Sequence, residues 1–251
     1  PEGSKFITGS YDNTAKIWTL EGNLVNTISH KGYVSTVDWS SDGKTVITGS
    51  WDATVQISPY NGRLTKTLRF PGAVNCVRFS RDGRKFLVCY GQGPLQVFSA
   101  AGDSLFSLPY NAGYGDFYTA DFSFTGDTII TGTSLGIIQS WANGSSLLTY
   151  SGHLGYIYDI RRLGNTARMV SAGADGRARL WNMKKLSVIK TLRGHLGSIT
   201  QGLPLRTGKE KKVATLDDDF QLNVWQLPDS IIHTIRYKAD TYDKSDSITA
   251  F

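Results

Sequence analysis

The chain has 251 residues, of which 40% are apolar, 27 are glycines and only 7 are prolines. A chain of this size and composition can bury a large core, which excludes an intrinsically disordered protein. Its uninterrupted apolar runs reach five residues, as at 86–90. A membrane-spanning helix needs roughly 20, so we expect no such segment. The formal net charge is +6, and it is distributed unevenly along the chain.

A short apolar stretch, a tight turn and a second apolar stretch recur six times. In chain order these segments read ITGSYDNTAKIW, ITGSWDATVQIS, LVCYGQGPLQVF, ITGTSLGIIQSW, VSAGADGRARLW and VATLDDDFQLNVW. The turn position, six residues before the last residue of each segment, is occupied in turn by Asp12, Asp52, Gln92, Leu135, Asp175 and Asp219, in steps of 40, 40, 43, 40 and 44 residues. A period of this length, with four short strands per repeat, is typical of a β-propeller blade.

The second repeat shows the expected strands most clearly. Alternating apolar and polar residues, with frequent β-branched residues, predict strand a at 33–40, b at 45–50, c at 55–60 and d at 64–70. The hairpin signals SSDGK, SRDGR and SFTGD separate strands a and b of repeats two, three and four. The predicted fold class is therefore all-β, a β-propeller of six recognisable blades in a single domain over residues 1–251.

The two ends of the sequence leave the number of blades open. A strand of type b at 5–10 follows the first residues, and the last residues, SITAF, resemble a strand of type a. In one interpretation the ring closes with six blades, and the C-terminal strand completes the first of them. In the other, the chain is an interior fragment of a seven-bladed ring, which the start at Pro1 in place of Met favours.

Three histidines stand before strand a of their repeats, 22 to 24 residues before the turn position. We expect each repeat to form a buried chain of hydrogen bonds, in which Asp accepts from His and a Ser or Thr connects His to the Trp indole. The complete sets are His153, Ser171, Asp175 and Trp181 in repeat five, and His195, Thr215, Asp219 and Trp225 in repeat six. Repeat two has His30, Thr48 and Asp52, with Ser58 at the Trp position.

Ser, His and Asp are also the residues of many hydrolase active sites. Here the set recurs with the period of the blade, which a single active site does not do, so we interpret it as structural. The sequence has no metal-ligand spacing, no glycine-rich phosphate loop after a strand and no nucleophile elbow. We therefore predict that the protein is not an enzyme, with no catalytic residues, no metal, no cofactor and no small-molecule substrate.

The cysteines and the first residues bear on the compartment. Cys76 and Cys89 are the only cysteines, and they do not form a CxxC pair. We interpret them as reduced, half-buried thiols on strands a and b of repeat three, with a cross-strand disulfide left open until the geometry is known. No secretory leader precedes the first repeat. We therefore expect the compartment to be the cytosol or the nucleus, and of the two we predict a cytoplasmic protein.

Large aromatic residues mark one rim of the predicted ring. The residue before the turn position is Tyr11 in the first repeat and Trp51 in the second. Paired exposed aromatics are typical of protein interfaces, and Tyr33 and Tyr156, at the start of strand a, are expected to join them. The alternative is that these rings lie flat on the neighbouring blade. We predict that the four residues bind a protein partner.

Basic residues concentrate in the fifth and sixth repeats. Residues 161–212 contain 13 Lys or Arg but only two acidic residues. Charge segregated in this way suggests a face that meets phosphate or an acidic protein, and a solvated surface without function is the alternative. The predicted RNA-binding residues are Lys16, Arg63, Lys66, Arg161, Arg162, Arg177, Arg179, Lys184 and Lys185. The sequence thus supports two hypotheses, a protein–protein scaffold and a ribonucleoprotein component.

The repeats resemble Trp-Asp (WD) repeat propellers over the whole chain. Within that class, four stretches resemble the receptor for activated C kinase family: SSDGKTVITGSWDAT, GHLGYIYDI with SAGADGRARLWNM, VFSAAGDSLFSL and IIHTIRYKADTYDKSDSITAF. The family's docking signature is a basic pair beside the turn Asp of blade one. Here the site reads Tyr11, Asp12 and Asn13, with Lys16 nearby, so the docking residues do not carry over.

The resemblance implies a cytoplasmic, non-enzymatic scaffold of the small ribosomal subunit. Such a protein contacts ribosomal RNA and ribosomal proteins, and recruits signalling proteins such as kinases in translation control. The alternative is a WD-repeat interaction subunit of another assembly, in ciliary transport, RNA processing or chromatin.

Overall fold

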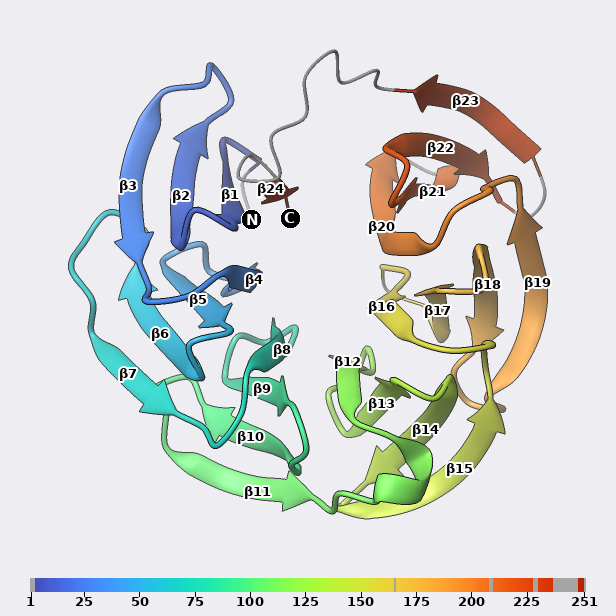
Figure 1. Cartoon of the computed structure of the whole chain (residues 1–251), viewed down its shortest axis with the longest axis horizontal. Helices are drawn as coiled ribbons and strands as arrows, with labels where there is room; N and C mark the ends of the chain where they lie inside the picture. The colour runs from blue at the N-terminus through green and yellow to red at the C-terminus, as the bar shows by residue number, and fades with distance from the viewer. Residues whose placement is uncertain (1–2, 165, 208–209, 228–229, 237–247, 251) are drawn as a thin grey trace. The chain divides into compact units, whose positions relative to one another are not determined.

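The computed structural model describes residues 3–164, 166–207, 210–227, 230–236 and 248–250. These residues form β-strands and one 3-10 turn, η1 (Ala112–Tyr114), as Figure 1 shows. The strands make six antiparallel sheets of four strands each, which we call blades 1 to 6. The predicted connector at 239–246 lies outside the described residues. The all-β prediction and the prediction of six blades are both confirmed.

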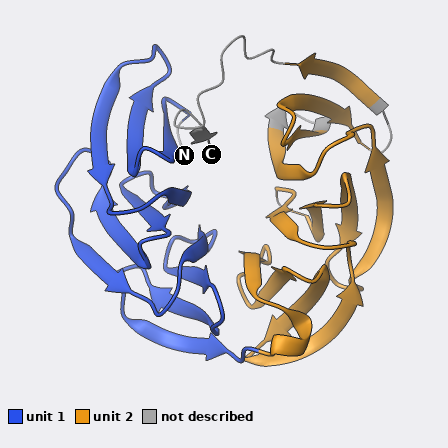
Figure 2. Ribbon diagram, in the orientation of Figure 1, with its two compact units in different colours: residues 1–110, 241–251 blue, residues 111–240 orange. Residues whose placement is uncertain are grey.

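The chain forms two compact units, one of residues 1–110 with 241–251 and one of residues 111–240 (Figure 2). The first unit contains blades 1 to 3. Blade 1 consists of β24 (Ile248–Ala250), β1 (Lys5–Ser10), β2 (Thr14–Thr19) and β3 (Leu24–Ser29); blade 2 of β4 (Val34–Trp39), β5 (Thr45–Ser50), β6 (Thr54–Pro59) and β7 (Lys66–Arg69); and blade 3 of β8 (Val74–Phe79), β9 (Lys85–Tyr90), β10 (Leu95–Ser99) and β11 (Ser104–Leu108).

The second unit contains blades 4 to 6. Blade 4 consists of β12 (Phe117–Phe122), β13 (Thr128–Thr133), β14 (Ile137–Ala142) and β15 (Ser145–Ser151); blade 5 of β16 (Ile157–Arg162), β17 (Arg168–Gly173), β18 (Arg177–Asn182) and β19 (Ser187–Arg193); and blade 6 of β20 (Ile199–Thr207), β21 (Glu210–Asp217), β22 (Gln221–Gln226) and β23 (Ser230–Arg236). The prediction that residues 1–251 form a single domain stays a prediction.

The first blade is completed by the C-terminal strand. β24 pairs antiparallel with β1, with Thr8 opposite Ala250 and Ser10 opposite Ile248. The other five blades take all four of their strands from consecutive sequence. Of the two sequence interpretations of blade 1, the structure has the one in which the last strand supplies the missing first strand.

The hairpins between the first two strands of a blade repeat one local design. In blade 2 the Ser40 hydroxyl donates to Asp42 Oδ1 at 2.6 Å, and the same carboxylate oxygen accepts the Lys44 N–H at 3.0 Å. Gly43 follows with φ of 70°, a left-handed conformation that glycine adopts without steric cost. Ser80 and Asp82 repeat the 2.6 Å contact in blade 3. The DG signals of the sequence are therefore realised as turns.

The core lies between neighbouring blades of a unit. The second strand of most blades is almost wholly buried, whereas every residue of the outer strand β15 is exposed. One cluster joins Ile47 and Ile57 of blade 2 to Val74 and Phe79 of blade 3. In the second unit Ile130 of blade 4 packs in one cluster with Ile160 and Trp181 of blade 5. Within a unit, neighbouring blades therefore bury their faces against one another, as repeat architectures require.

Carboxylates on the innermost strands bond to the next blade. Asp38 Oδ2 accepts the Phe79 N–H at 2.7 Å, and Asp121 Oδ2 accepts the Arg162 N–H at 2.9 Å. Asp159 repeats the contact to the Gly202 N–H at 3.2 Å. The inner strands of neighbouring blades do not form a continuous sheet, so these amides need side-chain acceptors. These repeated contacts were not predicted from the sequence.

The two cysteines face each other across neighbouring strands. Cys76 on β8 lies opposite Cys89 on β9, and the two form no disulfide. Cys76 is 2% and Cys89 0% exposed, so they are fully buried rather than half-buried as the sequence suggested. Burial and the neighbouring Cys76 raise the pKa of the Cys89 thiol well above its ordinary value. A thiol of this kind is a small core residue and a poor nucleophile.

We predict that Asp38→Ala destabilises the protein by about 1–3 kcal/mol, because it leaves the Phe79 N–H without its acceptor. Asp38→Asn keeps an acceptor oxygen and should lose clearly less. Urea unfolding of the three proteins, followed by circular dichroism, measures the difference. Equal midpoints for Asp38→Ala and the unaltered protein would show that the contact between the blades contributes no stability.

Candidate functional site

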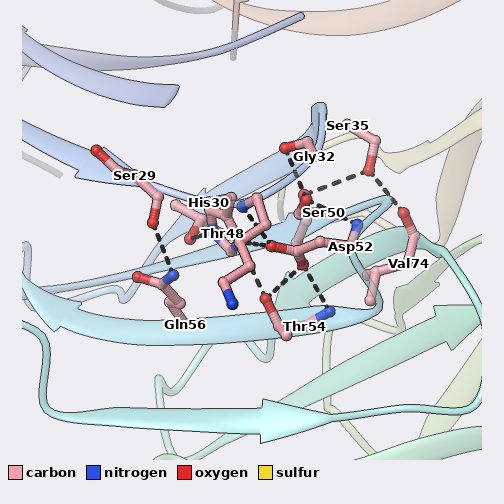
Figure 3. Close-up of polar contacts among 12 residues, drawn as sticks. Ser29, His30, Gly32, Ser35, Thr48, Ser50, Asp52, Thr54, Gln56 and Val74 are labelled. Atoms are coloured by element: carbon pink, nitrogen blue, oxygen red, sulfur yellow. Dashed lines mark hydrogen bonds and ion pairs between the residues drawn. The ribbon is translucent and has the colours of Figure 1, made fainter. Parts of the chain in front are cut away.

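Polar side chains tie the turn between β5 and β6 to the loop before β4 in blade 2 (Figure 3). His30 Nε2 lies 2.8 Å from Thr48 Oγ1, and its Nδ1 lies 3.3 Å from Asp52 Oδ2. The same carboxylate accepts the Lys31 N–H at 2.8 Å and, through Oδ1, the Thr54 N–H at 2.9 Å. Asp52 therefore connects two loops that are more than 20 residues apart in sequence.

Blade 5 contains the complete chain of four residues. His153 Nδ1 lies 2.8 Å from Asp175 Oδ1, and His153 Nε2 lies 2.6 Å from Ser171 Oγ. The Trp181 indole N–H donates to the same Ser171 oxygen at 2.8 Å. The same Nδ1 also lies 2.6 Å from the Arg179 guanidinium, which only donates, whereas the Asp175 carboxylate only accepts, so the two contacts place opposite demands on this nitrogen.

The ionisation of these groups follows from their surroundings. Burial lowers the pKa of His153 below its ordinary value, against the opposing influence of Asp175. Burial also lowers the pKa of His30. For Asp175 burial acts upward, but hydrogen bonds from His153 and Arg179 outweigh it and hold the pKa well below its usual range. The folded state of blade 5 thus pairs a neutral imidazole with an ionised carboxylate.

Blade 6 departs from the prediction at its acidic residue. His195 Nδ1 lies 2.7 Å from Asp217 Oδ2, so Asp217, and not the predicted Asp219, takes this position. Asp217 Oδ1 also accepts the backbone N–H groups of Gln221 at 2.7 Å and Asp219 at 3.2 Å. In blade 2 a serine two residues before the turn aspartate, Ser50, accepts the equivalent turn N–H at 3.0 Å. Asp217 therefore takes the roles that Asp52 and Ser50 have in blade 2, because it contacts the histidine and also accepts the turn N–H.

The other contacts in the hydrogen-bond chain of blade 6 are as expected. Blades 1 and 4 keep only part of such a hydrogen-bond chain. His195 Nε2 lies 2.6 Å from Thr215 Oγ1, which accepts the Trp225 indole N–H at 2.7 Å. Blades 1 and 4 keep a Trp donating to a Thr, as Trp18 does to Thr8 at 3.1 Å and Trp141 to Thr131 at 3.0 Å. In blade 2 Ser58 replaces the Trp, and its buried hydroxyl has no hydrogen-bond partner among the described residues.

The burial of these chains bears on a catalytic interpretation. Ser171 is 0% exposed, and its oxygen already contacts both His153 and Trp181. The same arrangement recurs in blades 2 and 6 with Thr in place of Ser. A nucleophile must reach its substrate, and here protein atoms occupy that place. In the part of the chain that the structure describes, no group of three or more His, Cys, Asp or Glu could hold a metal ion.

Three exposed aromatic rings lie together in the first unit. Tyr11 stacks on Tyr33 with 4.7 Å between ring centroids, and Trp51 lies 5.5 Å from Tyr33 and 6.3 Å from Tyr11. Their exposed fractions are 40%, 42% and 49% for Tyr11, Tyr33 and Trp51. The Trp51 N–H donates to the Tyr33 carbonyl at 2.9 Å, which fixes the two backbones together. We call Tyr11, Tyr33 and Trp51 the aromatic rim.

Tyr156 lies in the second unit, in a separate group of rings. Tyr156 stacks on Tyr158 at 5.8 Å, and Tyr118 meets both edge-on at 5.5 and 5.6 Å. Tyr156 is exposed, and Tyr118 and Tyr158 are partly buried. The sequence analysis singled out Tyr156 but missed Tyr118 and Tyr158, which occupy the second position of the inner strands β12 and β16. Their shared position, the second residue of an inner strand, is the sequence pattern that could have identified them.

Five of the nine predicted RNA-binding residues form ion pairs with carboxylates. Arg161 pairs with the buried Asp159 at 3.1 Å, Arg179 with Asp175 at 2.9 Å, and Arg162 lies 3.7 Å from Asp121. The side chains of these three arginines are mostly buried, and their role in RNA binding stays a prediction. Lys16 and Lys66 also form ion pairs, to Asp12 at 2.9 Å and to Asp103 at 3.2 Å. Of the remaining four, Arg63, Lys184 and Lys185 are exposed and Arg177 is partly exposed.

Comparison with known proteins identifies the repeats. The family described as "WD domain, G-beta repeat" matches residues 1–19, 22–57 and 144–182. The fold is a WD-repeat β-propeller. The structure describes six blades of it, although the family match covers well under half of the chain. Blades 3, 4 and 6 form the same four-stranded sheets outside the matched segments or largely so.

Three curated proteins illustrate the similarity. The chain is 38% identical over 71 residues to eukaryotic translation initiation factor 3 subunit I of Emericella nidulans, and 35% identical over 71 residues to that of Aspergillus terreus. Each match covers 28% of this chain and 21% of the relative, so the chain spans about a fifth of the relatives' length. A mouse F-box-like/WD repeat-containing protein, TBL1X, is 44% identical over 43 residues, which are 17% of this chain and 8% of that protein.

These similarities refine the sequence analysis. The WD-repeat prediction is confirmed, whereas the narrower resemblance to the receptor for activated C kinase family is not, because the matches are to a different WD protein. Among the described residues, no helix is long and apolar enough to cross a membrane.

We predict that acid destabilises the protein through its buried histidines. His30 and His153 have lowered pKa values in the folded state, so the unfolded chain binds protons first as the pH falls. The free energy of unfolding should be at its full value above the ordinary His pKa of 6.5 and fall below it. Below the ordinary Asp pKa of 3.8 the protonation of Asp175 adds a further loss.

Urea unfolding at pH 7.5 and pH 5.5 measures the effect. His153→Asn should show a smaller change in midpoint between the two pH values than the unaltered protein, because one of the two titrating sites is gone. His233→Asn, which alters an exposed histidine of β23, is the matched control and should keep the full change. Identical pH dependence in all three proteins would contradict the assignment to His153.

Proposed function

We propose that this protein is a non-enzymatic, cytoplasmic scaffold that binds other proteins in translation. The aromatic rim is the single observation that carries the protein-binding part of this proposal. Large rings with 40–49% exposure in one place are what interfaces use as anchors. The polar chains behind the rim are structural, and they hold the turns that display it.

The residues of the aromatic rim are already held in place before a partner binds. Trp51 directly precedes Asp52, whose carboxylate holds the Lys31 and Thr54 amides. Tyr33 lies two residues after Lys31, immediately before β4. The rings also limit one another's movement, because their centroids lie only 4.7–6.3 Å apart. A surface fixed before binding loses less conformational entropy when a partner docks.

The similarity to a subunit of translation initiation factor 3 supports the translation part of the proposal. The narrower proposal places the protein on the small ribosomal subunit with ribosomal RNA and ribosomal proteins, recruiting signalling proteins such as kinases. Its support is the sequence resemblance described above. The alternative, a WD-repeat subunit of another assembly, is supported by the similarity to the mouse F-box-like/WD repeat-containing protein.

We predict that Trp51→Ala weakens partner binding without unfolding the protein, because the ring is half exposed. The measurement is co-sedimentation of the tagged protein with initiation complexes in a sucrose gradient, together with its melting temperature. Phe106→Ala, which removes a ring of 40% exposure from the outer strand β11, is the matched control. We expect a loss of several-fold for Trp51→Ala and none for Phe106→Ala.

Two outcomes would count against this proposal. Unchanged co-sedimentation of Trp51→Ala would remove the aromatic rim from partner binding. A large drop in the melting temperature of Trp51→Ala, matching its loss of binding, would show that the ring is part of the core.

A second candidate function is RNA binding through one end of blade 5. Arg168, Lys184 and Lys185 are all exposed there. Arg168 lies opposite Asn182 in the β17–β18 pairing, and the Asn182 side chain accepts the N–H groups of Lys184 and Lys185 at 3.0 and 3.2 Å. Three cations on one hairpin end suit contacts to a phosphate backbone, which position a protein without reading sequence.

We predict that the double change Lys184→Glu with Lys185→Glu weakens RNA binding and flattens its salt dependence. Each lost phosphate contact reduces the slope of log K against log salt by about 0.7 for a single strand. Fluorescence anisotropy with a labelled poly-uridine oligonucleotide at several salt concentrations measures this. Lys31→Glu with Lys44→Glu changes the net charge equally at two exposed lysines of the first unit. If both double variants lose affinity to the same extent, binding follows net charge and not this hairpin end.

A further inference from the structure

The three tyrosines of the second unit stand beside exposed carboxylates. Tyr118, Tyr156 and Tyr158 lie within 5.5–5.8 Å of one another, centroid to centroid. Burial raises the pKa of Tyr158, and the Asp218 carboxylate and the Tyr156 hydroxyl raise it further. An acidic group near the rings is therefore part of their electrostatic surroundings. Asp218 and its neighbour Asp219 are both exposed.

The backbone explains why Asp218 and the tyrosines share one end of their blades. Tyr156 lies just before β16, and its carbonyl accepts the N–H of Ala174, in the turn between β17 and β18, at 2.9 Å. Asp218 lies in the corresponding turn of blade 6, and its N–H donates to the Ser198 carbonyl, just before β20, at 3.0 Å. The inner strands β16 and β20 are neighbours, joined by the contact from the Gly202 N–H to Asp159.

The local charge of this place is opposite to that of the segment around it. Residues 161–212 are strongly basic. The arginines of that segment nearest in sequence to the tyrosines, Arg161 and Arg162, are bound to Asp159 and Asp121. The carboxylates of Asp218 and Asp219 are exposed instead. This site therefore attracts a cation, although the protein as a whole has a net charge of +6.

We propose that Tyr118, Tyr156, Tyr158 and Asp218 form a binding site for an arginine side chain presented by an extended segment of a partner protein. The inference rests on the proposed protein-binding function and adds to it the chemistry of one partner residue. It concerns a different site from the aromatic rim, which has three rings but lies in the other unit.

Arginine fits this site better than other residues do. A guanidinium stacks on the face of a tyrosine and at the same time pairs with a carboxylate through its N–H groups. A lysine ammonium can make the ion pair, but it is more strongly hydrated and stacks less well. A phosphate group would be repelled by Asp218 and Asp219. Leu154 and Leu196, with exposed fractions of 77% and 92%, lie in the loops before β16 and β20 and offer apolar contacts to the flanking residues of the segment.

The test uses beads carrying degenerate heptapeptides that differ only at their central residue. One pool has arginine there, a second lysine, and a third citrulline, which has the shape of arginine without its charge. Retention of the whole protein on the beads is compared with that of Tyr156→Ala, Asp218→Asn and, as the matched control, Trp51→Ala in the aromatic rim. Circular dichroism checks that each variant is folded.

We expect retention to be several-fold greater on arginine than on citrulline beads, with lysine between them. Tyr156→Ala and Asp218→Asn should remove that excess, and Trp51→Ala should keep it. Equal retention on arginine and citrulline beads would overturn the proposal, as would an excess that survives Tyr156→Ala. Loss of partner binding by Trp51→Ala with no arginine preference would reject this site alone. An arginine preference with unaltered partner binding in Trp51→Ala would reject only the role of the aromatic rim.

Discussion

The hydrogen bond from a buried histidine to an aspartate in a turn is the interaction on which the display of this protein's surface depends. A blade has its strands fixed by backbone pairing, but the loops at its ends have no such ladder. In blades 2 and 5 the aspartate accepts from the imidazole and from backbone amides, so one ionised group ties two loops together. Burial of an ionised carboxylate is costly unless it is paired in this way.

In blade 6 the aspartate that contacts the histidine is not the one at the predicted turn position. Asp217 ends β21 two residues before the predicted Asp219, yet its carboxylate reaches His195 at 2.7 Å and the turn amides as well. Counting back from Trp225 cannot distinguish the two, because Asp217, Asp218 and Asp219 are chemically alike in sequence. Counting forward from His195 does distinguish them, because the spacing of 22 residues found in blades 2 and 5 leads to Asp217.

Other features were open to sequence reasoning to different degrees. The six blades follow from the repeat period, and the aromatic rim follows from Tyr11, Tyr33 and Trp51 having no role that the fold requires. The contacts of Asp38 and Asp159 with the next blade join residues about 40 positions apart, and a single sequence does not reveal such pairs. A count of charges along the sequence does not show that Arg161 and Arg179 have buried partners. The arginine site was missed since its members come from three different blades.

The central claim is that the polar chain of blade 2 holds the aromatic rim in place. Hydrogen exchange of Asp52→Ala, read at the amides of Lys31 and Thr54 together with the emission of Trp51, tests this most directly. The claim predicts much faster exchange at these two amides and a red-shifted Trp51 emission, while the amides that Asp217 holds in blade 6 keep their protection. Unchanged exchange at Lys31 and Thr54 would contradict it, because the carboxylate would then not be what secures the two loops.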